Sequence, residues 1–470
     1  MEKIDLFIRK LRREELPEAA IEVFVDFYRR LTSGSNATIP ESEIVPLKPE
    51  DISDRSRMDR YEALGNEALT KTAVIKLNGG LGTTMGMQGP KSLIKVKNGH
   101  SFLDITLMQM RHLNKQRGLT IPLLIMNSFY TDLATRKALA HRSDLPEGVP
   151  QCFIQHKYPK VLESTLEPAS LPSASSLEWY PAGHGDLLLT LHTSGLLERL
   201  LSTGYRYLFV SNIDNLGAEI DPAILGYFAG EGLDFLMEVT DRTDMDRKGG
   251  HLARLKTGRL VLREAAQCGP KDMDSGFFSD IARHPFFNTN NLWINCEAAH
   301  RMVRQGKIRD LPMVINRKKL VPYDPASPSV YHLESALGSA ISLFEKSAAV
   351  RVPRSRFVPV KNCEELLLVW SDYYILKPDY RMCANPARTS AHMTLKLDPE
   401  FYSSLDLLQS RFPHGAPSFV NGESFRVKGD VKFGLDTAIR GTVSITNETS
   451  VQALIEDNAV ITGDLTFQPH

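Results

Sequence analysis

A glycine-rich loop and the lysine that follows it are the residues in this sequence whose types and spacing first suggest chemistry. Residues 77–86 read Leu-Asn-Gly-Gly-Leu-Gly-Thr-Thr-Met-Gly, and Lys91 lies five residues further on. Glycines let the backbone approach a ligand and turn its N–H groups toward phosphate oxygens. We expect a strand before this loop and a helix after it, and together these three elements would form an anion site. The pattern therefore predicts a site for the phosphates of a nucleotide, with Lys91 suited to a triphosphate.

Two common phosphate-binding motifs fit this loop poorly. The dinucleotide fingerprint G-x-G-x-x-G needs a glycine where Met85 stands, although Asp104 lies near the distance expected for an acidic residue that binds a ribose. The P-loop pattern ends in Gly-Lys-Ser, whereas here Pro90 separates Gly89 from Lys91 and removes one N–H donor. A glycine-rich turn without a ligand is the remaining alternative, and the presence of Lys91 argues against it.

Short apolar runs that alternate with helical stretches predict the elements that position this loop. The runs cover residues 73–77, 122–126, 207–210 and 234–239. Such runs are typical of a sheet buried on both faces, so we expect an α/β domain with a mostly parallel sheet. Its ligands should gather at the carboxyl ends of the strands. Asp214 follows the third run, where a carboxylate can hold Mg²⁺, although a lone Asp in such a context is more often a turn residue.

The two ends of the chain have different patterns. Residues 1–65 show the apolar spacing of amphipathic helices, interrupted by loops, and this segment suggests packing or regulation. In the last 85 or so residues, similar units of alternating polarity begin at Gly429, Gly441 and Gly463, and the first and third are 34 residues apart, twice 17. This spacing predicts a small parallel β-helix, with an antiparallel β-subdomain as the alternative. Exposed strand edges there favour an oligomer contact or docking on the α/β domain.

The composition argues against several classes of function. Lys and Arg together number 56, as do Asp and Glu, so no global field favours nucleic acid or an anionic membrane. No apolar run approaches the roughly 18 residues of a membrane span, and no secretory pattern is visible, so we expect a cytoplasmic protein. The five cysteines are scattered and form no C-x-x-C pair, which argues against a disulfide framework or a zinc site.

Seven sequence blocks lie in order over nearly 300 residues, and they begin at Lys76, Gln155, Pro181, Ser211, Lys248, Phe287 and Val352. The first block ends at Lys91 and the last at Lys361. Together they resemble the motifs of eukaryotic-type UDP-glucose pyrophosphorylases, a branch of the sugar nucleotidyltransferases. The resemblance implies a central Rossmann-like sheet, mixed but mostly parallel and nucleotidyltransferase type A-like, with N-terminal helices and a small C-terminal left-handed parallel β-helix. It implies an N-terminal helical segment at 1–65, a catalytic domain at 66–375 and a β-helix domain at 376–470.

The implied reaction converts UTP and glucose 1-phosphate to UDP-glucose and pyrophosphate, by in-line attack of the sugar phosphate on the α-phosphorus. This nucleophile is already an anion at neutral pH, because the second phosphate pKa is about 6, so no general base is needed. Catalysis should come from bringing two polyanions together and neutralising the leaving group, which calls for lysines and a metal, Mg²⁺. Turnover of galactose 1-phosphate or an N-acetylhexosamine 1-phosphate stays open, as does a non-catalytic UDP-sugar sensor. An NAD(P)-dependent oxidoreductase is opposed by the glycine spacing and by Lys91.

The resemblance also implies which residues do the work. Lys361 matches the catalytic lysine, Lys91 acts on the triphosphate, and Asp214 is the metal ligand. Gln155, whose amide offers a donor and an acceptor, reads uracil together with the backbone of Gly183. His184 contacts the phosphate of the sugar phosphate. The remaining UTP contacts are Leu77, Asn78, Gly79, Gly80 and Asn212, and the sugar phosphate meets Gly80, Asn212, Gly250, Glu264, Asn288 and Asn290.

One segment departs from the family pattern. After Gln267 many relatives continue with Val-Pro and then a Glu-His pair, whereas residues 268–272 here read Cys-Gly-Pro-Lys-Asp, in a segment near the sugar. This departure weakens the prediction of glucose more than that of UTP. The C-terminal region is short for the family, which leaves open whether the protein forms a homo-oligomer through that domain.

Overall fold

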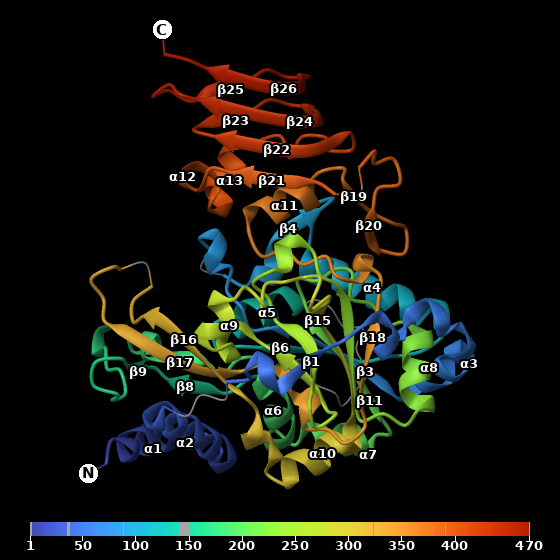
Figure 1. The fold of residues 1–470 in the computed structure, drawn as a ribbon, viewed down its shortest axis with the longest axis vertical. Helices are drawn as coiled ribbons and strands as arrows, with labels where there is room; N and C mark the ends of the chain where they lie inside the picture. The colour runs from blue at the N-terminus through green and yellow to red at the C-terminus, as the bar shows by residue number, and fades with distance from the viewer. Residues whose placement is uncertain are drawn as a thin grey trace. The chain divides into compact units, whose positions relative to one another are not determined.

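A computed structural model describes residues 2–34, 38–87, 89–140, 151–322, 324–390 and 392–469. The chain divides into two compact units (Figure 1). Unit 1 comprises Met1–Gly79, Thr120–Asn212 and Ile220–Arg354, and unit 2 comprises Gly80–Leu119, Ile213–Glu219 and Ser355–His470. None of the helices in the described ranges is long and apolar enough to cross a membrane.

Unit 1 is built on a mixed sheet whose strands follow the order β2-β18-β12-β15-β11-β3-β6-β7. Strand β15 runs antiparallel to both of its neighbours on this path, and the other described pairs along it are parallel. The expectation of a mostly parallel sheet is therefore confirmed. The strands are β2 (Ser53–Asp54), β3 (Thr72–Asn78), β6 (Leu123–Asn127), β7 (Cys152–Ile154), β11 (Tyr207–Asn212), β12 (Phe235–Asp241), β15 (Phe286–Asn295) and β18 (Ser347–Arg351).

The four predicted apolar runs all form strands, namely β3, β6, β11 and β12. All seven residues of β3 are buried, as a central strand covered on both faces requires. An antiparallel extension, β1 (Ile44–Pro46), β13 (His251–Leu255) and β14 (Leu260–Arg263), joins the sheet through β15.

Helices pack around this sheet and share its apolar core. At the N-terminus, α1 (Lys3–Arg13) and α2 (Glu18–Ser33) bury Phe7, Leu11 and Phe24 completely. The described part of 1–65 thus begins with two helices, as expected, and continues through short 3-10 turns and strands after Pro40. The other helices of unit 1 are α3 (Glu62–Ala68), α5 (Asp132–Leu139), α6 (Leu187–Thr193), α7 (Leu196–Ser202), α8 (Pro222–Gly230), α9 (Pro270–Asp274) and α10 (Cys296–Arg304).

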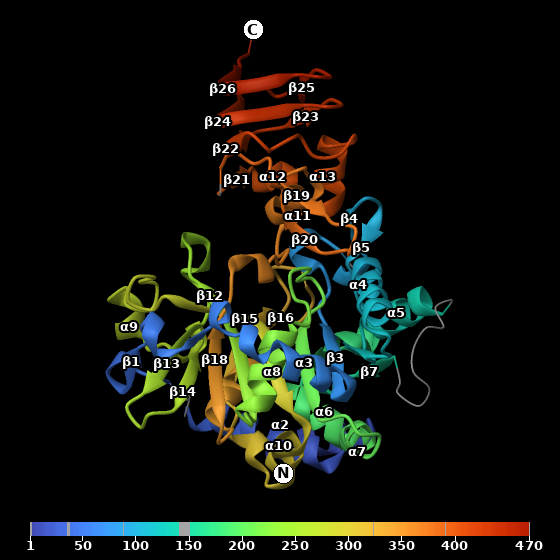
Figure 2. The ribbon, with the colours of Figure 1, turned by 90° about the vertical axis from the view of Figure 1, so that its right-hand side faces the viewer.

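Unit 2 combines the glycine-rich segment with the C-terminal strands. Its C-terminal strands β21, β22, β24 and β26 pair in parallel in this order, and β23 pairs in parallel with β25 (Figure 2). The antiparallel alternative is therefore wrong for these strands. The elements are α4 (Phe102–Arg117), α11 (Cys363–Trp370), β21 (Thr394–Leu397), α12 (Pro399–Tyr402), α13 (Leu405–Arg411), β22 (Gly422–Lys428), β23 (Val431–Phe433), β24 (Ala438–Asn447), β25 (Ala453–Ile455) and β26 (Val460–Phe467), with the hairpins β4 (Lys95–Lys97)/β5 (His100–Ser101) and β19 (Tyr374–Leu376)/β20 (Met382–Ala384).

The predicted 17-residue repeat of the C-terminal units is wrong. The offset between paired residues is 22 in β23–β25, 22 falling to 20 after a register shift in β24–β26, and 18 over most of β22–β24, so no pairing has an offset of 17. Gly429 comes just before β23, whereas Gly463 lies within β26, which belongs to another sheet. These glycines have positive φ angles, 82° and 81°, which favour glycine wherever a chain turns. The two glycines therefore do not occupy equivalent positions in the sheets, and the 34-residue spacing between them does not measure a structural repeat.

Candidate functional site

In unit 2, backbone contacts join the two ends of residues 81–90 of the glycine-rich segment. Leu81 forms an isolated bridge with Pro90, and the Gly82 N–H donates to the Gly89 carbonyl at 3.3 Å. Two short 3-10 turns, Thr83–Met85 and Lys91–Leu93, and the β4/β5 hairpin follow the strand, and α4 begins at Phe102. The expectation that a helix follows the loop directly is wrong, since Pro90 and the closing bridge fold the chain back first. Backbone N–H groups and Lys91 are thus the donors that this loop can offer an anion.

Asp104 lies near the sequence distance at which a dinucleotide fingerprint has its ribose-binding acidic residue. In the structure it caps a helix instead. Its Oδ2 accepts hydrogen bonds from the Ser101 N–H and Oγ, both at 2.8 Å, and from Lys95 Nζ at 3.0 Å. Ser101 Oγ in turn accepts from the Asp104 N–H, which completes a capping box at the start of α4. This engagement removes the support that Asp104 gave to a dinucleotide site.

Three of the residues predicted to bind the nucleotide lie together in unit 1. Gln155 is 5% exposed, and its Oε1 accepts a hydrogen bond from the Gly183 N–H at 2.8 Å. Because the partner is a donor, this atom must be the amide oxygen, and the NH₂ group lies on the other side. That group rests against Gly79, where an added Cβ would lie only 2.2 Å from Gln155 Nε2. The structure therefore brings Gly79, Gln155 and Gly183 together, as predicted.

Leu77 and Asn78 lie at the end of β3 with buried side chains. Leu77 belongs to the apolar core. Asn78 Nδ2 donates to Asn127 Oδ1 at 2.8 Å and to Thr135 Oγ1 at 2.9 Å. The Leu77 side chain and the amide nitrogen of Asn78 thus support the strand end, whereas Asn78 Oδ1 is buried and has no hydrogen-bond partner among the described residues.

Three asparagines predicted for the sugar site form one cluster on β11 and β15. Asn290 Nδ2 donates to Asn212 Oδ1 at 2.9 Å, and the Asn290 N–H donates to Asn288 Oδ1 at 2.9 Å. Asn290 has a φ of +58°, an unusual conformation for a residue other than glycine. Its Oδ1 is buried and has no hydrogen-bond partner in the described part of the chain. A buried acceptor held in a strained conformation points to a ligand hydroxyl as the missing donor.

Gly250 and Glu264, also predicted for the sugar, are in contact. A Cβ added at Gly250 would lie 2.6 Å from the carboxylate of Glu264, so a larger residue there would require the carboxylate to move. Glu264 caps the 3-10 helix Ala265–Gln267, and its N–H donates to Gln267 Oε1 at 2.8 Å. This reciprocal capping fixes the carboxylate over Gly250.

The divergent segment that follows Gln267 is tied to the residue before Glu264. Asp272 Oδ2 accepts from Arg263 Nη2 at 2.6 Å and from the Glu41 N–H at 2.7 Å. The Arg263 side chain is fully buried and pairs also with Glu41 Oε2, at 2.7 Å. Sequence reasoning missed the pair of Arg263 with Glu41, because these two residues lie 222 positions apart along the chain.

His184 has a defined tautomer. Its Nδ1 accepts the N–H of Leu337 at 3.1 Å, so in the neutral ring the proton is on Nε2. Burial lowers the pKa of His184 from its ordinary value of 6.5, against the opposing effect of Glu334. The ring is therefore neutral near pH 7 and offers an Nε2–H donor, which suits a phosphate oxygen.

A second cluster lies in unit 2. Lys91 Nζ donates to Asp214 Oδ2 at 2.5 Å, and the two side chains are 17% and 16% exposed. The residue after Asp214 holds this segment in place, since Asn215 Oδ1 accepts the Val358 N–H at 2.9 Å and Asn215 Nδ2 donates to the Arg356 carbonyl at 3.1 Å. The structure thus brings together the predicted phosphate-binding lysine and the predicted metal ligand, and anchors them to the stretch before Lys361.

Lys361 lies at the start of α11, and Glu365 supports it. The Lys361 N–H donates to Glu365 Oε2, and Lys361 Nζ lies 5.7 Å from the centre of the Phe357 ring. Burial raises the pKa of Glu365 above its ordinary value, although the Lys361 N–H and the charges of Lys361 and Lys91 act in the opposite direction. Sequence reasoning missed Glu365, yet Asn362 caps α11 and Glu365 stands three residues later, which is a capping spacing that could have identified it.

The predicted residues thus fall into groups within each unit. Unit 2 holds Gly80, Lys91, Asp214 and Lys361, and unit 1 holds Leu77, Asn78, Gly79, Gln155, Gly183, His184, Asn212, Gly250, Glu264, Asn288 and Asn290. Gly80 differs from Gly79 in that a Cβ there would meet nothing within 4 Å in the described structure. The described residues therefore leave room for a side chain at position 80.

Comparison with known proteins assigns the chain to a family. The model of the UTP--glucose-1-phosphate uridylyltransferase family matches residues 21–440. The protein of that name from Encephalitozoon cuniculi is 41% identical over 422 residues, covering 88% of this chain and 82% of that protein. The Hordeum vulgare protein is 40% identical over 441 residues, with 93% and 88% covered.

Solved structures agree with this assignment. A variant of the Leishmania major UDP-glucose pyrophosphorylase, crystallised in complex with UDP-glucose, is 37% identical and matches with a TM-score of 0.89 over 100% of both chains. A Trypanosoma brucei protein described as UDP-glucose phosphorylase is 38% identical, with the same TM-score over 99% of this chain and 100% of that one. The chain therefore belongs to the UTP--glucose-1-phosphate uridylyltransferase family.

Proposed function

We propose that this protein joins UTP to glucose 1-phosphate and releases UDP-glucose and pyrophosphate. The observation that carries the proposal, in a chain of this family, is the contact between Lys91 and Asp214. A lysine charge beside a hard carboxylate suits a phosphate chain that is bound together with its metal ion. The transfer needs no catalytic base, so the proposal requires only cations and positioning groups.

The reaction is a displacement at phosphorus. A phosphate oxygen of glucose 1-phosphate forms a bond to the α-phosphorus of UTP, and the bond from that phosphorus to the oxygen bridging to the β-phosphate breaks. Lys361 stabilises the charge that develops during transfer, and Lys91 binds the triphosphate and the departing pyrophosphate. Glu365 fixes the backbone from which Lys361 projects, through the Lys361 N–H.

Asp214 is the residue proposed to hold Mg²⁺. A single carboxylate fits this ion, which proteins often bind through one or two carboxylates together with substrate phosphates. When bound, the ion neutralises phosphate charge and orients the triphosphate. The position of Asp214 soon after the end of β11 and its contact with Lys91 support this assignment.

The residues of unit 1 are proposed to recognise the base and the sugar. Gln155, with the Gly183 backbone, reads uracil, and the backbone at 77–80 approaches the nucleotide. The Nε2–H of His184 donates to the phosphate of the sugar phosphate. The sugar hydroxyls meet Asn212, Asn288, Asn290, Gly250 and Glu264, and the orphaned Oδ1 of Asn290 supports this role.

Finer features of the fold and setting belong to the same proposal. We infer that the parallel C-terminal strands form a left-handed β-helix, and that the main sheet is Rossmann-like, of the nucleotidyltransferase type A-like kind. The division into a helical segment at 1–65, a catalytic domain at 66–375 and a C-terminal domain at 376–470 is proposed for function. We also propose a cytoplasmic location and a homo-oligomer that forms through the C-terminal domain.

A pyrophosphate-release assay tests the function. The purified protein with UTP and Mg²⁺ is given glucose 1-phosphate, galactose 1-phosphate or N-acetylglucosamine 1-phosphate in turn. We expect the highest kcat/KM with glucose 1-phosphate, and activity that falls when Asp214→Asn replaces the metal ligand. Equal turnover of several sugars would refute glucose specificity. UDP-glucose binding without turnover of any sugar would instead identify a sensor.

A further inference from the structure

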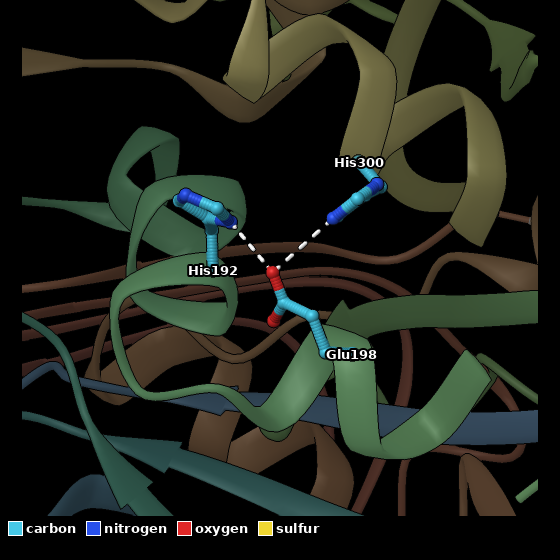
Figure 3. Close-up of side chains that lie close together, drawn as sticks. All are labelled: His192, Glu198 and His300. Carbon is cyan, nitrogen blue, oxygen red and sulfur yellow. Dashed lines mark hydrogen bonds and ion pairs between the residues drawn. The ribbon is translucent and has the colours of Figure 1, made fainter. Parts of the chain in front are cut away.

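Two histidine side chains in unit 1 converge on one oxygen of a glutamate carboxylate, and the proposed reaction uses none of these three residues. His192 lies at the end of α6, Glu198 on α7 and His300 on α10. Figure 3 shows both imidazole rings pointing at the carboxylate, with His192 Nδ1 at 3.0 Å and His300 Nε2 at 3.2 Å from Glu198 Oε1. One ligand atom from each residue lies within 4.8 Å of the others.

The spacing of these atoms fits a tetrahedral ion. Zinc takes imidazole nitrogens and carboxylate oxygens at about 2.0–2.2 Å, so two ligands of a tetrahedral zinc lie roughly 3.3–3.5 Å apart. The two observed nitrogen–oxygen separations, 3.0 and 3.2 Å, are slightly shorter, and the two imidazole nitrogens lie within 4.8 Å of each other. Two imidazoles and one carboxylate are also the protein ligands of several zinc sites that complete the shell with water.

Hydrogen bonding within the cluster does not satisfy the carboxylate. Both rings approach Oε1, while Glu198 Oε2 is buried and has no hydrogen-bond partner among the described residues. A cation bound at Oε1, which both rings approach, would stabilise the charge of a carboxylate whose other oxygen has no donor. This orphaned oxygen is an observation independent of the two histidines.

The cluster is open to ions from solvent. The side chains of His192, Glu198 and His300 are 30%, 43% and 23% exposed and line a surface cavity of about 790 Å³, which leaves room for a water ligand. Arg304 and Arg309 line the same cavity and oppose a cation. Arg309 is within 3.4 Å of Glu22, so that part of its charge is compensated.

We propose that His192, Glu198 and His300 form a Zn²⁺ site in unit 1, with water as the fourth ligand. The ion would cross-link α6, α7 and α10. Because an ion that binds only the folded chain shifts the folding equilibrium, the bound metal stabilises unit 1. The site lies outside the residues assigned to uridylyl transfer, so the proposal does not depend on that reaction.

The test measures metal binding directly, on the full chain with Mg²⁺ in excess. Co²⁺, a spectroscopic substitute for Zn²⁺, should give the intense visible absorption of tetrahedral coordination, and Zn²⁺ should displace it and raise the melting temperature. In His300→Ala and Glu198→Gln, Zn²⁺ affinity should fall by at least about 10–100-fold, since even loss of an outer-shell partner has an effect of that size. The melting temperature of these variants should no longer respond to Zn²⁺.

A matched control replaces a histidine outside the cluster. His414 is exposed, and His414→Ala should bind Zn²⁺ as the wild type does. UDP-glucose formation without added Zn²⁺ should be unchanged in all three variants, so failure of the zinc site and failure of the proposed reaction are distinguishable. The proposal is overturned if the wild type gives no tetrahedral Co²⁺ spectrum, or if His300→Ala and Glu198→Gln bind Zn²⁺ as tightly as the wild type.

Discussion

Replacing Gly79 with alanine should impair UTP recognition through Gln155. An added Cβ would lie 2.2 Å from Gln155 Nε2, whereas real Cβ contacts are almost never shorter than 3.0 Å. Nε2 must therefore move by about 1 Å, and we expect this movement of the amide to disturb the 2.8 Å hydrogen bond that its Oε1 accepts from the Gly183 N–H. A buried donor left unsatisfied costs about 1–3 kcal/mol. If that cost falls on the nucleotide-bound state, kcat/KM for UTP should drop by about 5- to 140-fold.

Gly89→Ala is the matched control for this prediction. Gly89 lies in the same glycine-rich segment, has no atom within 4 Å of an added Cβ in the described structure and does not have a positive φ. Steady-state kinetics with varied UTP should show near wild-type kcat/KM for Gly89→Ala and the loss for Gly79→Ala. A thermal melt separates a local effect from misfolding. Wild-type kcat/KM in a folded Gly79→Ala protein would refute the role given to the packing of Gln155 on Gly79.

Three further predictions concern Lys361, Glu365 and Asp272. Lys361→Ala should lower kcat by orders of magnitude and change UTP affinity much less, and an unchanged kcat would rule out a catalytic role. Glu365→Ala removes the acceptor of the Lys361 N–H and should lower kcat with little change in KM for UTP. Glu365→Gln keeps an acceptor and should retain most of the rate. Equal losses of kcat in both variants would show that the charge of Glu365 matters and its positioning of Lys361 does not. Asp272→Asn should lower the free energy of unfolding by about 1.5–3 kcal/mol, because the buried Arg263 loses a charged partner and keeps only Glu41. A urea midpoint equal to that of the wild type would contradict this account.

The strands of the sheet were predictable where most of their residues are apolar. The runs that became β3, β6, β11 and β12 consist mostly of apolar residues, and burial on both faces leaves this signature. Strand β15 was not predicted, although it lies between β12 and β11 at the centre of the path. Its residues 288–291 are Asn-Thr-Asn-Asn, which break the apolar pattern. A polar segment in a buried strand is invisible to a rule based on hydrophobic runs.

The site was predictable to the extent that motifs carried it, and the contacts between distant segments were not. The motif blocks identified Lys91 and Asp214, but their contact joins residues 123 apart in sequence, and no local pattern encodes it. The pairing of Arg263 with Glu41 has the same origin, since two separate segments each supply one charge. Glu365 is the exception, because its spacing from Asn362 is a local capping signal.

The polar residues that hid β15 from prediction also explain how it presents Asn290. Thr289 Oγ1 donates to the Glu238 carbonyl at 2.7 Å, and Asn291 Nδ2 donates to Glu238 Oε2 at 3.1 Å. Next to Glu238 the β12–β15 register shifts, so that β15 bulges where Asn290 has its positive φ. A non-glycine residue in that conformation costs about 1–3 kcal/mol, and the two anchors to Glu238 offset this cost. The same residues therefore break the apolar pattern and hold Asn290, whose Oδ1 has no hydrogen-bond partner among the described residues, in a fixed orientation. The departure from the apolar pattern and the ligand contact proposed for Asn290 thus have one structural cause.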